Sequence, residues 1–183
     1  MKRVSRWRPA TILPVLLAIL PAGSRAQQQA QQQIDSAWLK FDRSAKTVQF
    51  QLIAALTGLN GGLNFNGFRE GDLTVVVPVR WKMRVDFYNH DGVLPHSAEV
   101  IKAEFPLPPG PVDPAIPGAV TLQLGSGVVS EGRDDMRFVA EPAGEYVFFC
   151  AVPGHGMAGM WIRLRISADA AEPAMLQTPA KQP

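Results

Sequence analysis

The chain has 183 residues, with 18 lysine and arginine residues against 16 aspartate and glutamate residues, three histidines and a single cysteine. This length suits one domain with a substantial hydrophobic core. A lone cysteine excludes an intramolecular disulfide framework. The near-neutral charge excludes the basic domain that nucleic-acid binding would require.

The first 26 residues are typical of a secretory signal. Basic residues precede a mostly apolar run at 11–20, which is too short to span a bilayer, and Ser24-Arg25-Ala26 offers small residues for cleavage after Ala26. Cleavage would remove five basic residues and leave 13 basic against 16 acidic residues, a net charge of −3. We therefore expect a periplasmic or otherwise exported protein, with membrane contact only if the leader stays uncleaved.

The two segments that flank the predicted domain have biased compositions. Residues 27–34 are rich in glutamine, and residues 168–183 are rich in alanine and proline without periodicity. Neither segment offers enough apolar surface to pack, so we expect a solvated spacer and a disordered tail. The folded domain is predicted over residues 35–167.

Alternating apolar residues predict β-strands through this domain. Val48, Phe50 and Leu52 alternate with polar residues, and the longest alternation covers residues 75–87. Pro78 cannot donate to a sheet ladder, so this run is predicted as two strands that bend or change sheet there. Further strands are expected to begin at His96 and to cover residues 119–124, 136–140, 145–150 and 161–166.

Six prolines between residues 106 and 117 predict an extended surface loop, because each proline removes a donor and restricts φ. No long amphipathic helix and no internal repeat is evident. About eight short strands with turn signals between them favour an all-β fold, an antiparallel Greek-key β-sandwich.

Residues 150–160 carry the chemistry of the chain. Their sequence, Cys-Ala-Val-Pro-Gly-His-Gly-Met-Ala-Gly-Met, places a thiol, an imidazole and a thioether on one turn between two strands. Cysteine and methionine are soft ligands that favour copper, and two histidines with one cysteine and a weak methionine indicate a blue-copper electron-transfer centre. Strand alternation points Met160 and His96 toward the core. The predicted metal ligands are His96, Cys150, His155 and Met160.

Each of these residues also has an ordinary interpretation. A lone cysteine or methionine is often a core residue, and a lone histidine is often structural. Met157 competes for the axial position but is expected at the surface, and His90 is expected to be solvated in a turn. Ser97 and Asn66 are candidate hydrogen-bond donors beside the site, with plain strand or turn roles as the alternative.

These motifs resemble those of the cupredoxins, and those of the sulfocyanin and rusticyanin group in particular. The resemblance covers residues 38–167, although the proline-rich segment has no match in the family. It implies a mononuclear type 1 copper bound by His96, Cys150 and His155 with Met160 as the axial ligand. It also implies that the edge of His155 reaches the surface within an apolar docking patch. The matching pieces are Asn64-Phe65-Asn66-Gly67, Leu94-Pro95-His96-Ser97, Cys150-Ala151-Val152-Pro153-Gly154-His155 and Gly159-Met160, and the patch candidates are Val93, Leu94, Val152, Pro153, Met157 and Ala158.

The function expected on these grounds is that of a monomeric one-electron carrier. It would dock on redox proteins such as cytochromes or a terminal oxidase through small transient interfaces. An enzyme is not expected, because a catalytic copper needs further histidine ligands and only His90 remains, while a single cysteine excludes a thiolate-bridged dinuclear centre. Copper storage or delivery is one alternative, and a metal-free β-sandwich interaction module with Cys150 in its core is another.

Overall fold

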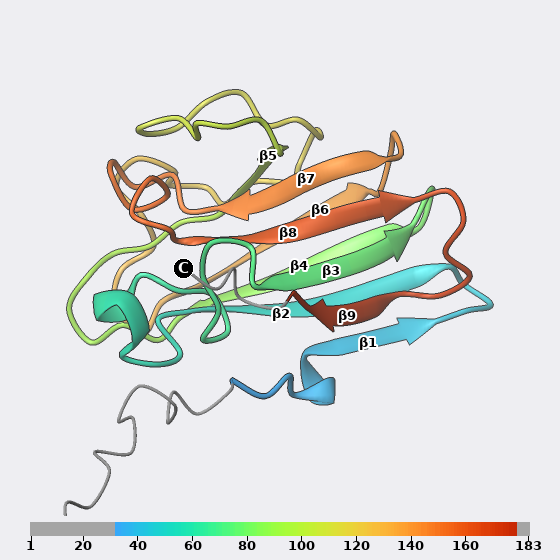
Figure 1. Cartoon of the computed structure of the whole chain (residues 1–183), viewed down its shortest axis with the longest axis horizontal. Helices are drawn as coiled ribbons and strands as arrows, with labels where there is room; N and C mark the ends of the chain where they lie inside the picture. Colours follow the sequence, from blue (N-terminus) through green and yellow to red (C-terminus); the bar gives the residue numbers. More distant parts are fainter. Residues whose placement is uncertain (1–31, 179–183) are drawn as a thin grey trace, which may run out of the picture. The chain divides into compact units, whose positions relative to one another are not determined.

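The computed structural model describes residues 32–178 (Figure 1). Within these residues the regular elements are nine strands and two short 3-10 helices. The predicted signal at residues 1–26 and most of the glutamine-rich spacer lie outside the described residues. The elements are η2 (Ser36–Trp38), β1 (Leu39–Asp42), β2 (Thr47–Ala54), η3 (Leu59–Gly62), β3 (Leu73–Pro78), β4 (Lys82–Asn89), β5 (Glu99–Lys102), β6 (Arg133–Val139), β7 (Gly144–Phe149), β8 (Trp161–Ser167) and β9 (Ala174–Gln177).

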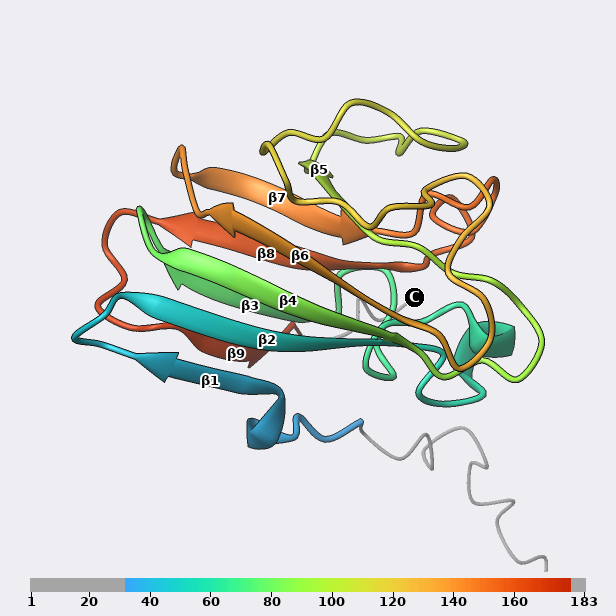
Figure 2. The same cartoon turned by 180° about the vertical axis from the view of Figure 1, so that it is seen from behind.

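The strands form two sheets that face each other (Figure 2). One sheet has the order β1-β2-β4-β6, and the other has the order β5-β7-β8-β3-β9. The predicted all-β sandwich is confirmed, but it is not purely antiparallel, because β2 pairs with β4 and β3 pairs with β8 in parallel. Between β2 and β4 the chain crosses to the second sheet to form β3, and this excursion lets the returning strand run in the same direction as β2.

The change of sheet occurs where the proline predicted it. Pro78 ends β3, and β4 begins in the other sheet at Lys82 after a short turn in which Arg80 has φ of 67°. Since proline has no N–H to donate, the ladder of β3 stops there.

The main core lies between the two sheets. The inward positions of β2 and β4 that alternation predicted are buried there, and they meet Phe148 and Ile162 of the facing sheet. Cys150 and Met160 belong to this same cluster, and both are completely buried. The large buried side chains of this core include Phe50, Leu52, Met83, Phe87, Phe148 and Ile162.

A second, smaller core lies on the outer face of β5 and β7. The proline-rich segment covers this face and is seen above β7 in Figure 1. Leu107 attaches the segment to the domain, because its side chain packs among Ile101, Val147 and Phe149. The segment has no regular secondary structure, as predicted, but it is packed rather than free of the domain. Its backbone also bonds to the domain, since the Ala115 N–H donates to the Val100 carbonyl at 2.8 Å.

The strand predicted at residues 119–124 is wrong. Only an isolated bridge forms, between Glu99 and Val120. The Thr121 hydroxyl accepts the Ala98 N–H at 3.1 Å. This backbone N–H therefore bonds to a side chain and not to a neighbouring strand.

Two edge strands were not predicted. β9 (Ala174–Gln177) pairs with β3 in the segment expected to be a disordered tail, so that expectation is wrong for these residues. β1 pairs with β2 at the other sheet's edge. Both strands are largely exposed and therefore lack the alternation that marks a half-buried strand.

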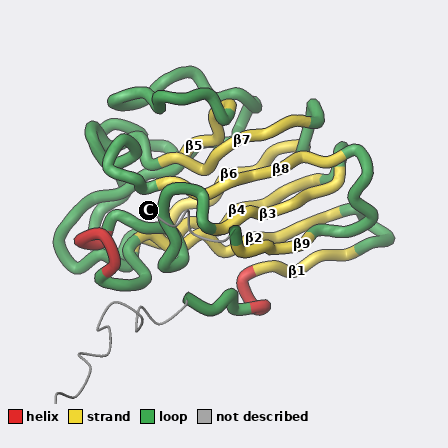
Figure 3. Tube along the Cα trace, viewed as in Figure 1, coloured by secondary structure: helices red, strands yellow, loops and turns green. Residues whose placement is uncertain are grey.

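The helical content is small, as Figure 3 shows. No helix within residues 32–178 has the length and apolar character needed to cross a bilayer. The loops that follow β2, β4 and β7 gather at one end of the sandwich, on the left in Figure 1, and this end holds the candidate site.

Candidate metal centre

The loop at residues 150–160 is held by the two strands that it joins. β7 and β8 are paired up to Phe149 and Trp161, and the Cys150 N–H donates to the Met160 carbonyl at 3.1 Å. The Met160 N–H donates back to the His155 carbonyl, also at 3.1 Å. The backbones of the three predicted ligands of this loop are therefore tied to one another.

Glycines flanking His155 allow the loop to fold onto the strand end. A Cβ built on Gly156 would lie 1.7 Å from Cε2 of Phe149, so only glycine fits there. Gly154 has φ of 86°, in the left-handed region that glycine adopts without strain. These two glycines therefore permit the backbone path on either side of His155.

His96 comes from the connection between β4 and β5. It forms an isolated antiparallel bridge with Val128, in which the His96 N–H donates to the Val128 carbonyl at 3.1 Å and the Val128 N–H donates to the His96 carbonyl at 2.7 Å. The strand that His96 was expected to begin starts instead at Glu99, as β5. A Cβ on Gly127 would lie 2.9 Å from the His96 nitrogen, so the neighbouring turn also requires glycine.

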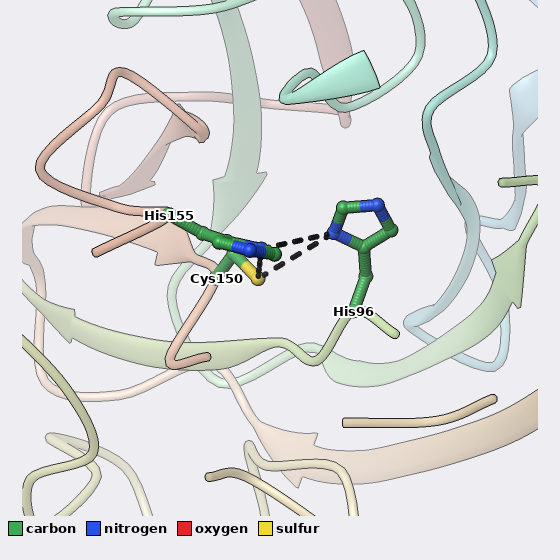
Figure 4. Close-up of side chains that lie close together, drawn as sticks. All are labelled: His96, Cys150 and His155. Carbon is green, nitrogen blue, oxygen red and sulfur yellow. Dashed lines mark hydrogen bonds between the residues drawn. The ribbon is translucent and has the colours of Figure 1, made fainter. Parts of the chain in front are cut away.

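Figure 4 shows how three of the predicted ligands converge. Nδ1 of His96 and Nδ1 of His155 are 3.2 Å apart, and Sγ of Cys150 lies 4.0 Å from the first and 3.7 Å from the second. All three donor atoms lie within 4.8 Å of one another. Residues from two separate loops thus meet at one point.

Met160 is completely buried at the start of β8, within the core that also contains Cys150. Its thioether is on the inward side, as alternation predicted. The competitor Met157 is 59% exposed, as expected, and His90 is exposed beside Glu131. Of the two loop methionines, Met160 is the buried one, and it shares the main core with Cys150.

Burial controls the protonation of the site. Burial raises the pKa of the Cys150 thiol to about 11, against the lowering effect of the Ser97 N–H. Burial also lowers the pKa of His96, which Asp91 partly offsets, and lowers the pKa of His155, to which the neighbouring His96 adds. The metal-free site at neutral pH is therefore an uncharged thiol beside two neutral imidazoles, with both imidazoles free to act as ligands.

Ser97 and Asn66 have different roles. The Ser97 N–H points at Sγ of Cys150 at 3.5 Å, while its hydroxyl accepts the Ala151 N–H and donates to the Leu124 carbonyl. Asn66 instead joins its loop to β2, through Ile53 and Gln51. Ser97 is thus a hydrogen-bond donor to the thiol, and Asn66 has the structural role that was its alternative.

The donor set fits a single first-row transition-metal ion. Thiolate and imidazole ligands lie about 2.0–2.3 Å from such an ion, so three of them in a trigonal arrangement are separated by about 3.5 Å. The observed separations of 3.2, 3.7 and 4.0 Å bracket that value. Two imidazoles and one thiolate form a set that suits copper rather than a hard, oxygen-seeking cation.

Sequence reasoning missed Asp91. Its Oδ2 lies 3.0 Å from Nε2 of His96, on the side of the ring away from the thiol. The residues 89–92, Asn-His-Asp-Gly, were interpreted only as a turn. The carboxylate five positions before a candidate histidine was the available signal, but the spacing alone does not show that the turn aims it at the ring.

Comparisons with known proteins show which family the chain resembles. A family model described as "Sulfocyanin (SoxE) domain" matches residues 35–177. Sulfocyanin of Sulfolobus acidocaldarius is 29% identical over 143 residues, which cover 73% of this chain and 70% of that protein.

Solved structures of rusticyanin resemble the fold. A crystal structure of rusticyanin variants is 23% identical and covers 74% of this chain and 85% of that chain, with a TM-score of 0.50. Rusticyanin from Thiobacillus ferrooxidans is 25% identical and covers 71% of this chain and 86% of that chain, with a TM-score of 0.45. The family match extends over most of the chain, and the resemblance inferred from its motifs is confirmed: the chain belongs to the sulfocyanin family of cupredoxins.

Proposed function

We propose that this protein binds one copper ion through His96, Cys150 and His155, with Met160 as a weak fourth ligand, and carries single electrons between other redox proteins. The observation that carries the proposal is the meeting of the three strong donors within 4.8 Å of one another. Copper is the ion that the sulfocyanin family and this soft donor set indicate. When bound, copper supplies a one-electron couple at a fixed position.

The surrounding residues support electron transfer by holding the donors still. Backbone bonds fix the Cys150, His155 and Met160 loop, and the bridge to Val128 fixes His96. A site that is positioned by packing before metal enters needs little rearrangement when its charge changes. The Ser97 N–H places a dipole on the sulfur, which favours the thiolate over the thiol.

The exposure of His155 supports a docking role for this end of the molecule. His155 is partly exposed, whereas His96 and Cys150 are completely buried, so His155 is the ligand that offers electrons a short path to the surface. Apolar side chains surround this end, with Val93 83% and Met157 59% exposed. A small apolar surface suits brief contacts with partners such as cytochromes or a terminal oxidase.

The number of histidines available as copper ligands fits an electron carrier better than a copper enzyme. The chain has three histidines, and His90 alone stands outside the site. A catalytic copper would need open positions and its own histidine ligands. Storage or delivery of copper would be better served by exposed, exchangeable ligands than by a buried cysteine. Export, with cleavage after Ala26, and a monomeric state remain parts of this proposal.

Titration of purified protein with Cu(II), followed by visible absorption, tests the proposal. We expect one equivalent of copper to produce an intense thiolate-to-copper band that ascorbate removes and oxidation restores. Cys150→Ser should abolish the band, while His90→Gln, which changes an exposed histidine, should leave it unchanged. Stopped-flow mixing of the reduced protein with an oxidised cytochrome then measures the carrier role directly.

The other outcomes are distinct. One copper bound without colour would favour storage or delivery. No copper bound at all would favour a metal-free interaction module. A coloured protein that exchanges electrons neither with cytochromes nor with a terminal oxidase would retain the copper site and contradict the carrier role.

A further inference from the structure

His96 uses its two ring nitrogens for different contacts. Nδ1 faces the Cys150 sulfur and the His155 ring, whereas Nε2 lies 3.0 Å from Oδ2 of Asp91. The His96 side chain is completely buried, and the Asp91 side chain is 13% exposed. The carboxylate therefore lies directly behind the predicted ligand, shielded from most of the solvent.

The Asp91 carboxylate is held by its own turn. Its Oδ1 accepts the N–H groups of Val93 and Leu94 at 2.8 and 2.9 Å, and the Asp91 N–H donates to Oδ1 of Asn89 at 3.0 Å. Oδ1 therefore already accepts two backbone N–H groups, and Oδ2 is the carboxylate oxygen that faces Nε2 of His96 at 3.0 Å. An ionised carboxylate only accepts hydrogen bonds, so Nε2 of His96 is the donor.

A second element leaves room for this carboxylate. Gly62, in η3, packs against it so closely that a Cβ there would lie 2.9 Å from Oδ2 of Asp91. Gly62 also has φ of 89°, so a side chain would strain the backbone as well as collide. Two loops that are distant in sequence thus define the position of the same oxygen.

We propose that Asp91 is the positioning residue for the copper site: it holds His96 as the tautomer with hydrogen on Nε2, frees Nδ1 for the metal, and lowers the reduction potential. This inference rests on the proposed copper site. A carboxylate behind an imidazole makes the ring a stronger donor, and its negative charge stabilises Cu(II) more than Cu(I). Positioning and tuning come from one contact.

Asp91→Asn tests both parts. The amide keeps the size of the side chain and the oxygen that Val93 and Leu94 need, but it removes the charge and presents an N–H to Nε2. Loss of such an outer partner typically weakens metal binding about 10- to 100-fold. If that loss falls on Cu(II), the midpoint potential rises by about 60–120 mV, at 59 mV per tenfold for one electron.

The second readout needs no copper. In the metal-free protein, nitrogen NMR of His96 should report a single tautomer with hydrogen on Nε2, and Asp91→Asn should shift the population toward hydrogen on Nδ1. Asp169→Asn, an exposed aspartate beyond the far end of β8, is the control for net charge and should change neither readout. Gly62→Ala displaces the carboxylate without removing it, so it should move both readouts in the same direction as Asp91→Asn.

The outcomes separate the two proposals. A blue protein whose potential and His96 tautomer are unchanged by Asp91→Asn overturns the role of Asp91 and leaves the copper site standing. A wild-type protein without a blue band overturns the copper site, and the tautomer measurement then decides the Asp91 contact by itself. If Asp91→Asn does not fold, Gly62→Ala carries the test.

Discussion

Glu99 is a carboxyl group that the fold buries without completing its hydrogen bonds. Oε1 accepts the Val112 N–H at 3.3 Å, and within the described residues Oε2 has no partner. Burial raises the pKa of Glu99 from 4.5 to about 7, and the nearby Asp113 adds to the effect. An acid with a raised pKa in the folded state costs stability once it ionises.

The pH dependence of Glu99→Gln follows from that shift. The wild-type protein has no penalty below pH 4.5, loses stability as the pH rises toward 7, and carries the full penalty above it. Relative to Glu99→Gln, the free energy of unfolding of the wild type should therefore fall by up to about 3 kcal/mol between pH 4 and pH 8. Urea denaturation at several pH values measures this difference. Glu104→Gln, which changes an exposed glutamate, is the matched control, and a flat difference for Glu99→Gln would contradict the buried acid.

At the scale of elements, the proline-rich segment is the least conventional part of the fold. It is attached to the outer face of β5 and β7 through Leu107, which is 7% exposed, whereas Leu122 farther along is 90% exposed. Loss of a buried leucine typically costs about 2–5 kcal/mol, while an exposed substitution stays within about 0.5 kcal/mol.

Leu107→Ala should therefore lower the free energy of unfolding by about 2 kcal/mol, and Leu122→Ala should leave it unchanged. Chemical denaturation of the two variants compares them directly. The copper band should persist in both, because Cys150 faces the main core rather than this smaller one. Equal stability of the two variants would mean that the segment is not anchored by Leu107.

The sequence predicts those elements that bury one face. Val48, Phe50 and Leu52 alternate because β2 has the core on one side, and Pro78 marks the change of sheet because it cannot donate. The edge strands β1 and β9 show no such alternation, because most of their side chains are exposed and need not be apolar. The parallel pairing of β2 with β4 and of β3 with β8 was not predicted either, because strand direction depends on how the connections cross between the sheets.

In the candidate site, too, some residues could be predicted from the sequence and one could not. Cys150, His155 and Met160 could be named as candidate ligands because they lie in one short stretch, and His96 because a strand was expected to begin there. Asp91 was not, because its contact exists only once the turn at residues 89–94 has closed and η3 has packed against it. The spacing of residues along the chain indicates candidate metal ligands, whereas the hydrogen-bond partners of those ligands depend on the tertiary structure.

At the scale of the whole domain, both sheets contribute to one end of the sandwich. β7 and β8 carry the Cys150, His155 and Met160 loop, while His96 follows β4 of the opposite sheet. Because backbone hydrogen bonds and the main core hold these residues, the donors are positioned by the fold itself. We therefore predict that gain or loss of one electron hardly moves the donor atoms.

X-ray absorption at the copper edge, measured on the same sample when oxidised and when reduced by ascorbate, tests this claim most directly. We predict one short copper–sulfur bond and two copper–imidazole bonds in both states, with only slight lengthening on reduction. Loss of an imidazole on reduction, or a copper surrounded only by nitrogen and oxygen, would contradict the account.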